Sequence, residues 1–238
     1  MKVGPWDEAA AFDTLKRWDP TWSVAVEKVT SNPWQGALDR KTAELISVAI
    51  NAACTNLNLD GTRRHIKRAI EAGATRDELL MVLKMASLLS IHVCSLGAPI
   101  LIEEAKTAGV SARGQSSETP ACDQMRAAGQ WNVAWDAFYE IDPEWTEAFI
   151  VCGAPVYAGG ILDPKLAELL SIAFDVSFTH MYAPGVRRHI KAALTLGATV
   201  EEIMDVFKLC VAQGVQACNM GIPILEEELS KSADGTPQ

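Results

Sequence analysis

The chain has 238 residues, of which 49% are apolar and 21% are charged, a composition typical of folded globular proteins and not of disordered ones. Its net charge of −9 argues against a nucleic acid or an anionic membrane surface as the main partner, because proteins that bind those surfaces carry basic patches. We find no apolar run of the roughly 18–20 residues that cross a membrane, and no hydrophobic signal core near the start, so we expect a cytoplasmic protein.

A duplication organises the chain. Shifting the sequence by 124 residues aligns LDRKTAELISVA with LDPKLAELLSIA, and 19 of 38 positions are identical between residues 38–75 and 162–199. Agreement at this level indicates a tandem repeat. The stretch 109–121 is rich in Ser, Gly and Thr and predicts an exposed linker. We therefore expect two repeats, residues 1–112 and 113–238.

The segment that the two repeats share begins with two predicted helices. In the first repeat, a helix over 39–54 starts at Asp39, a residue type that caps helix N-termini. The next helix follows Gly61 and ends at Gly73, because glycine is favoured just beyond a helix C-terminus. Asp163, Gly185 and Gly197 hold the same positions in the second repeat.

Two further helices complete each predicted unit. Thr75 and Glu78 have the spacing of a capping box before a long apolar helix over 79–94. Pro99 is expected to interrupt the last helix. The second repeat has the corresponding residues Thr199, Glu202 and Pro223. Since no segment has a strand pattern, the sequence predicts an all-α fold.

The helix 61–73 carries the motif Arg-Arg-His-Ile-Lys, which recurs at 187–191. Helical spacing places the inward-facing stripe of this helix at four apolar or small residues, Ile66, Ala69, Ile70 and Gly73. His65 then lies on one shoulder of the stripe and Arg63 on the other, while Arg64 points away. A histidine in that position can reach into a cleft between helices.

A glutamate on the preceding helix is the expected partner of each histidine. Glu44 and Glu168 lie in mid-helix at the boundary of the apolar face, within reach of His65 and His189 respectively. A Glu–His pair in such a place is a plausible acid–base pair. The alternative is structural, because both residue types also serve as hydrogen-bonding or ion-pairing groups between helices, and a duplicated helix contact would preserve them equally.

The segments LDRKTAELISVAI and TRRHIKRAIEAGATRDELLMVL resemble the core of the carboxymuconolactone decarboxylase family, within the alkyl hydroperoxidase D-like superfamily. The resemblance covers residues 38–104 and 162–228. It implies a tandem duplication of an all-helical unit that assembles into homo-oligomers, such as dimers or trimers of two-repeat chains, with the active site among helices. The resemblance therefore predicts both a fold and a class of chemistry.

The decarboxylase branch of this family implies a lyase without a metal or organic cofactor. Such an enzyme removes carbon dioxide from a small carboxylated or lactone substrate and protonates the resulting carbon. Proton transfer would fall to His65 and His189, oriented by Glu44 and Glu168. Arg63 and Arg187 would seat the substrate carboxylate, because a guanidinium binds a carboxylate through two parallel hydrogen bonds.

The hydroperoxidase branch implies a different activity, a thiol peroxidase or reductase that uses a C-x-x-C pair. Neither repeat has that pair: Cys54 stands in the first repeat and Phe178 at the equivalent position of the second. A dithiol cycle needs two thiols in contact, so this activity is disfavoured. The histidines also lack metal-ligand spacing, so we predict no metal site.

The repeats differ in the loop before the motif, which reads TNLNLD in the first and THMYAP in the second. His180 and Tyr182 add a possible proton carrier and a phenol donor to the second repeat. The second repeat is therefore the better equipped for chemistry. A third hypothesis remains, a non-catalytic oligomeric binding protein that keeps only the fold.

Overall fold

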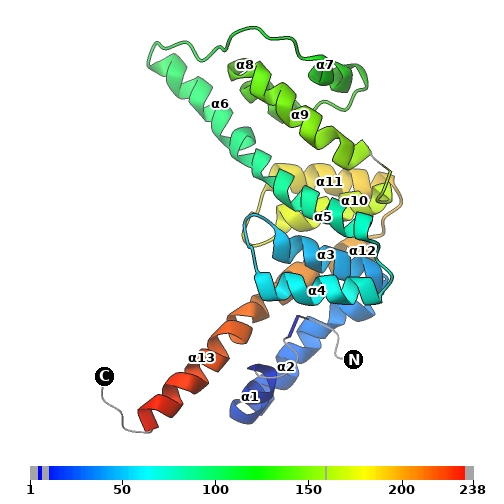
Figure 1. Ribbon diagram of the computed structural model, residues 1–238, viewed down its shortest axis with the longest axis vertical. Helices are drawn as coiled ribbons and strands as arrows, with labels where there is room; N and C mark the ends of the chain where they lie inside the picture. The colour runs from blue at the N-terminus through cyan, green and yellow to red at the C-terminus, as the bar shows by residue number, and fades with distance from the viewer. Residues whose placement is uncertain (1–4, 7–10, 159, 234–238) are drawn as a thin grey trace. The chain divides into compact units, whose positions relative to one another are not determined.

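The computed structural model describes residues 5–6, 11–158 and 160–233, and every regular element in these ranges is a helix (Figure 1). The all-α prediction is confirmed. The α-helices are α1 (Ala11–Trp18), α2 (Pro20–Ser31), α3 (Arg40–Ala52), α4 (Leu59–Glu71), α5 (Arg76–Leu88), α6 (His92–Thr107), α7 (Pro120–Ala127), α8 (Asp136–Ile141), α9 (Pro143–Ala158), α10 (Pro164–Val176), α11 (Ala183–Thr195), α12 (Val200–Ala212) and α13 (Gln216–Ala233). Short 3₁₀ turns are η1 (Asn32–Gln35), η2 (Leu89–Ile91), η3 (Val133–Trp135) and η4 (Gln213–Val215).

The predicted ends of the helices over 39–54 and 61–73 agree closely with the structure. Asp39 caps α3 by accepting a hydrogen bond from the Thr42 amide. Gly73 follows α4 with a φ of +92°, a left-handed conformation that glycine adopts without strain. Helix α4 itself begins two residues before Gly61, because the Asn58 side chain accepts a hydrogen bond from the Gly61 amide and caps the helix there.

The apolar helix predicted over 79–94 has different limits. Helix α5 ends at Leu88 and a 3₁₀ turn leads into α6, which continues through Pro99. Proline removes one backbone hydrogen bond, but here it does not end the helix. The helical run Arg76–Thr107 is long and apolar enough to cross a membrane by length and composition. This corrects the expectation that no segment reaches that length, although buried core helices meet the same criterion.

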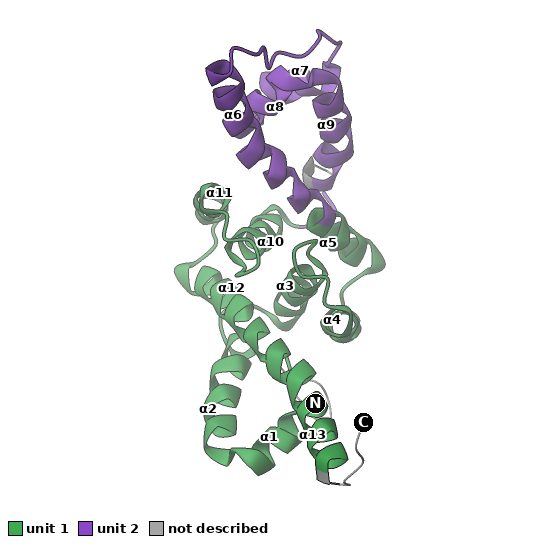
Figure 2. Cartoon of the chain, turned by 90° about the vertical axis from the view of Figure 1, so that its left-hand side faces the viewer, with its two compact units in different colours: residues 1–86, 163–238 green, residues 87–162 purple. Residues whose placement is uncertain are grey.

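The chain forms two compact units that do not follow the repeats. One unit consists of residues 1–86 and 163–238, and the other of residues 87–162 (Figure 2). The division of the sequence repeats between residues 112 and 113 stays a prediction about the sequence. In the larger unit, α1 packs on α13 and α2 packs on α12, so the first helices of the first repeat cover the end of the second. In the smaller unit, α6 of the first repeat packs on α8 of the second.

The centre of the larger unit joins equivalent helices of the two repeats. Helix α3 packs on α10, each also packs on the helix that follows it, and their inward side chains form the buried core. The Thr55 and Thr179 hydroxyls, exactly one repeat length apart in sequence, lie 3.0 Å from each other. The two repeats therefore pack on each other through α3 and α10. Each holds its own Glu–His pair between two helices, α3 and α4 in the first repeat and α10 and α11 in the second.

Candidate functional site

The first repeat holds its Glu–His pair in the core. His65 on α4 and Glu44 on α3 are both 0% exposed, and His65 Nδ1 lies 2.7 Å from Glu44 Oε2. The indole of Trp34 stacks on the imidazole, with 6.0 Å between ring centroids and 11° between planes. Burial lowers the pKa of His65, against the hydrogen bond to Glu44 that raises it. The imidazole is therefore neutral at pH 7 and closed to solvent.

The predicted inward face of α4 is wrong. Ile70 is exposed, whereas Arg64, His65 and Arg68 are buried, so the helix turns a polar stripe inward. Burial lowers the pKa of Arg64 to about 10, with a further contribution from the neighbouring charge of Arg68. The prediction failed because hydrophobic spacing assumes that the buried face is apolar.

The second repeat places its pair nearer to solvent. His189 is 8% exposed, and its Nδ1 lies 2.6 Å from Glu168 Oε2, whose side chain is 22% exposed. On the other side of the ring, Arg188 Nη2 lies 2.8 Å from His189 Nε2. A guanidinium only donates, so Nε2 accepts and the ring proton sits on Nδ1, which donates to Glu168. The second repeat thus has a neutral imidazole held between a carboxylate and a cation.

A buried carboxyl group beside this histidine was not predicted. Asp175, in the last turn of α10, is 1% exposed, and its Oδ2 lies 3.8 Å from His189 Nε2. Burial raises the pKa of Asp175 to about 7, against the charge of Arg188 that lowers it. The alignment of the two repeats contained a sign of this group, because Asp175 is the counterpart of Asn51 and both lie within an otherwise apolar run.

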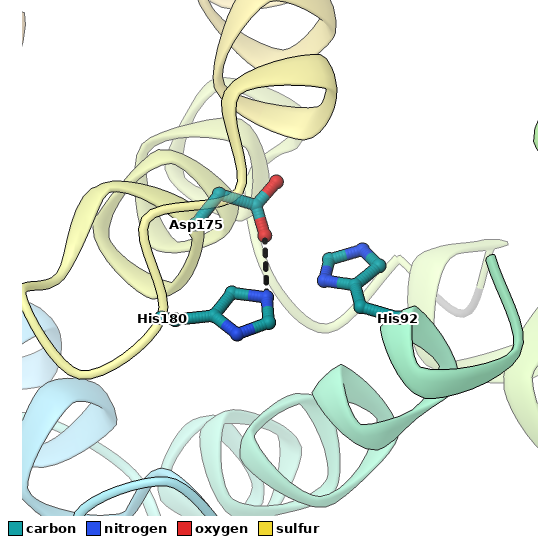
Figure 3. A group of neighbouring side chains, drawn as sticks. All are labelled: His92, Asp175 and His180. Atoms are coloured by element: carbon teal, nitrogen blue, oxygen red, sulfur yellow. Dashed lines mark ion pairs between the residues drawn. The ribbon is translucent and has the colours of Figure 1, made fainter. Parts of the chain in front are cut away.

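A second histidine, His180, lies beside Asp175, and Figure 3 shows the ion pair between them. His180 Nε2 lies 4.0 Å from Asp175 Oδ1, and the His180 ring is tilted against the ring of Tyr182 with centroids 5.8 Å apart. Burial lowers the pKa of His180. The structure therefore brings together four of the predicted residues of the second repeat, namely Glu168, His189, His180 and Tyr182, around an aspartate that sequence analysis missed. Their catalytic and binding roles stay predictions.

The close approach of helices α10 and α11 depends on Gly185. A Cβ atom built on Gly185 would lie 1.8 Å from Asp175 Oδ2. We expect Gly185→Ala to displace the Asp175 carboxyl and to cost about 1–3 kcal/mol of stability, as overpacking does. Gly221→Ala in α13 is the control, because its Cβ meets nothing within 4 Å. Thermal unfolding of both variants tests this, and equal melting temperatures would contradict it.

The two arginines predicted to seat a carboxylate lie away from the histidines. Arg63 and Arg187 are both exposed. Arg187 lines an open groove of about 930 Å³ on the outer face of α11, together with Lys191 and the apolar residues Val176, Met181, Val186, Ile190 and Leu194. His189 is on the inner face of the same helix and does not line this groove. The cation beside the imidazole is Arg188, the counterpart of Arg64, which the sequence analysis had pointed away from the inward stripe.

The cysteines do not form a redox pair. All six are free, and burial raises the pKa of both Cys122 and Cys210 to about 12. A thiol acts as a nucleophile only when it ionises, so these two are unreactive at neutral pH. The exposed Cys54 stands without a second thiol bonded to it. These observations weigh against a dithiol peroxidase.

Comparison with known proteins agrees with this architecture. The model of the carboxymuconolactone decarboxylase family matches residues 25–90 and 143–226. A crystal structure from Burkholderia xenovorans LB400, of a protein proposed to be a gamma-carboxymuconolactone decarboxylase subunit, superposes with a TM-score of 0.87. The two chains are 34% identical, and the match covers 95% of this chain and 93% of that one. No curated protein matches the chain.

Proposed function

The chain belongs to the carboxymuconolactone decarboxylase family, and on that premise we propose that it is a cofactor-independent lyase that removes carbon dioxide from a small carboxylated or lactone substrate. We place the reaction in the second repeat, at His189. The observation that carries the proposal is the arrangement of this imidazole, with Glu168 on Nδ1 and Arg188 on Nε2.

Arg188 provides the positive charge that binds the substrate carboxylate. Its guanidinium lies within hydrogen-bond distance of the ring nitrogen that handles the proton, and its side chain is exposed. An incoming carboxylate is a better acceptor than a neutral imidazole, so it draws the guanidinium to itself and frees Nε2. We therefore assign to Arg188 the role that the sequence analysis gave to Arg187.

The imidazole then handles one proton. The bond between the substrate carbon and its carboxylate breaks, the electron pair passes into the conjugated lactone, and carbon dioxide leaves. Once Arg188 has left Nε2, this nitrogen takes up one proton. The Nε2–H proton then adds to the carbon that lost the carboxylate, and the ring returns to its neutral form. Glu168 stabilises the protonated ring through its bond to Nδ1. The net change consumes one proton for each carbon dioxide released.

The first repeat lacks the same access. His65 and Glu44 are fully buried and Trp34 covers the ring, so no substrate reaches Nε2 without opening the core. We propose that this repeat is a structural partner of the active one. The predicted catalytic roles of His65 and Glu44, and the predicted binding role of Arg63, are accordingly not part of the proposed mechanism.

We also propose that the chain acts as a homo-oligomer. Helix α13 carries a row of exposed apolar side chains, Met220, Ile224, Leu225 and Leu229, at helical spacing. Rows of this kind on a surface helix mark association sites. The proposed partner molecules are thus the small substrate and further copies of the chain.

Neighbouring arginines give a sharp test of the site. Carbon dioxide release is measured from a panel of lactone acids with the wild type, Arg188→Gln and Arg187→Gln. We expect Arg188→Gln to lower kcat/KM about 10- to 100-fold, the value of a charged hydrogen bond of about 1.5–3 kcal/mol. Arg187→Gln removes the same charge one residue away on the other face, and its effect should stay below about threefold.

His189→Ala completes this experiment, with an expected loss of about 10²- to 10⁴-fold in kcat. The proposed function is wrong if the wild type releases no carbon dioxide from any lactone acid. The assignment of the carboxylate seat is wrong if Arg187→Gln is the more damaging of the two arginine variants.

A further inference from the structure

We propose that Asp175 is a positioning residue of the second repeat that stores a proton and supplies it to His189 during each turnover. This inference rests on the proposed function and extends it to a residue that no comparison assigns. It also gives a physical reason for the second repeat alone to be active.

Asp175 lies between His180 and His189. Its Oδ2 lies 3.8 Å from His189 Nε2, and its Oδ1 lies 4.0 Å from His180 Nε2. Both distances exceed a hydrogen bond, and a side-chain movement of about 1 Å closes either one. The carboxyl is therefore not the hydrogen-bond partner of the resting imidazole, a position that Glu168 holds on the opposite nitrogen.

The chain keeps this carboxyl group buried at a cost. Asp175 is 1% exposed in a last helical turn, and Gly185 leaves room for no more than a hydrogen atom beside Oδ2. An ionised carboxylate is disfavoured in such a place, so the group holds its proton near neutral pH. A carboxylic acid that is half-protonated near pH 7 is suited to both giving and taking a proton.

The repeats differ at this group in a consistent way. Asn51 and Asn56 in the first repeat correspond to Asp175 and His180 in the second. Both asparagines have structural bonds, from Asn51 Nδ2 to the Ser47 carbonyl and from Asn56 Nδ2 to the Ile50 carbonyl. Two amides that cannot titrate thus stand where the second repeat has two groups that can.

The proposed cycle balances. After the substrate carboxylate has drawn Arg188 away, His189 Nε2 is free to accept a proton. The Asp175 carboxylic acid transfers its proton to Nε2, which forms the protonated ring that protonates the substrate carbon, and Asp175 is left as a carboxylate. That carboxylate takes a proton from solvent before the next turnover. Charged and titratable groups near it within the same unit include His180 and His189, and the charge of Arg188 also acts on it, with Glu168 beyond the imidazole.

The first test needs no substrate. Aspartate carboxyl carbons are labelled with ¹³C in the full-length chain, and the Asp175 signal is assigned by its loss in Asp175→Asn. We expect this signal to titrate with a midpoint near pH 7, while exposed aspartates titrate near 4. A midpoint among the exposed aspartates overturns the inference.

The second test is kinetic and uses two buried aspartates. Asp175→Asn introduces the amide that the first repeat already accommodates as Asn51, so the chain should fold. We expect kcat to fall about tenfold or more, below the loss in His189→Ala, with KM changed by less than about twofold. Asp205→Asn is the matched control: Asp205 is 2% exposed and only structural, accepting from the Ala37 amide at 2.5 Å and from Lys208 Nζ at 2.8 Å.

The control separates a proton store from a structural group. Asp205→Asn should lower the melting temperature and leave kcat unchanged, whereas Asp175→Asn should lower kcat without lowering the melting temperature. An unchanged kcat, or an Asp175→Asn chain that does not fold, overturns the inference. If the wild type decarboxylates none of the lactone acids, the proposed function fails, and the titration of Asp175 alone decides whether the residue holds a proton near neutral pH.

Discussion

His65→Leu should destabilise the protein by about 3–5 kcal/mol, because it leaves a fully buried carboxyl group without its partner. Glu44 is 0% exposed, and its bond to His65 Nδ1 is the one hydrogen bond of the carboxyl within the described part of the chain. The loss can be read from urea unfolding at pH 7, as a lower midpoint at an unchanged slope.

Two further variants sharpen this expectation. The double change Glu44→Leu with His65→Leu should recover most of the loss, because a buried polar pair replaced by apolar residues is often neutral. His189→Leu should cost less than His65→Leu, since its partner Glu168 retains contact with water. An equal cost for His65→Leu and His189→Leu would show that burial does not set the value of these pairs.

Asp175→Asn should make the protein more stable than the wild type by up to about 4 kcal/mol above pH 7, and by much less near pH 4. The pKa of Asp175 is about 7 in the folded chain against an ordinary value of 3.8, and each tenfold change in proton affinity corresponds to about 1.4 kcal/mol. Between these values the folded chain keeps a proton that the unfolded chain has lost, so the wild type loses stability as pH rises. Asparagine has no proton to lose.

The measurement is the difference in unfolding free energy between Asp175→Asn and the wild type, taken at several pH values from 4 to 8. Asp39→Asn is a control of opposite sign. Burial acts to raise the pKa of Asp39, but hydrogen bonds from Thr42 hold it below its ordinary value. The stability that Asp39 contributes is present above pH 4 and is lost as pH falls. A difference for Asp175→Asn that does not change with pH would contradict the expectation.

The sequence predicted the all-α fold and the Glu–His pairs of the candidate site. The N-caps, the capping boxes and the pairing of Glu44 with His65 follow from local rules, because each depends on residues at fixed spacing or on adjacent helices. The helix face was wrong for a physical reason. Polar side chains can be buried when they form hydrogen bonds with one another, and a prediction from hydrophobic periodicity does not include them.

Asp175 and Arg188 show the other limit of sequence analysis. An aspartate at the end of a helix and the second of two arginines are both residues that are usually exposed to solvent. Only the fold shows that one is enclosed and that the other touches the imidazole. The replacement of Asn51 by Asp175 was visible in the repeat alignment, but its meaning depends on the burial of both positions.

Helices of each repeat pack on helices of the other, so the two halves of the sequence depend on each other for a complete structure. Residues 1–112 and 113–238 each lack helices that cover them, since α1 and α2 pack on α13 and α12, and α6 packs on α8. Neither fragment is complete alone, yet each carries the surface that the other requires. The peptide between them, over residues 110–119, has no regular structure, and its hydrogen bonds to α8 run from the Gly114 amide to the Glu140 carbonyl and between the Thr119 and Tyr139 hydroxyls. We expect two separately expressed fragments, residues 1–112 and 113–238, to assemble by complementation.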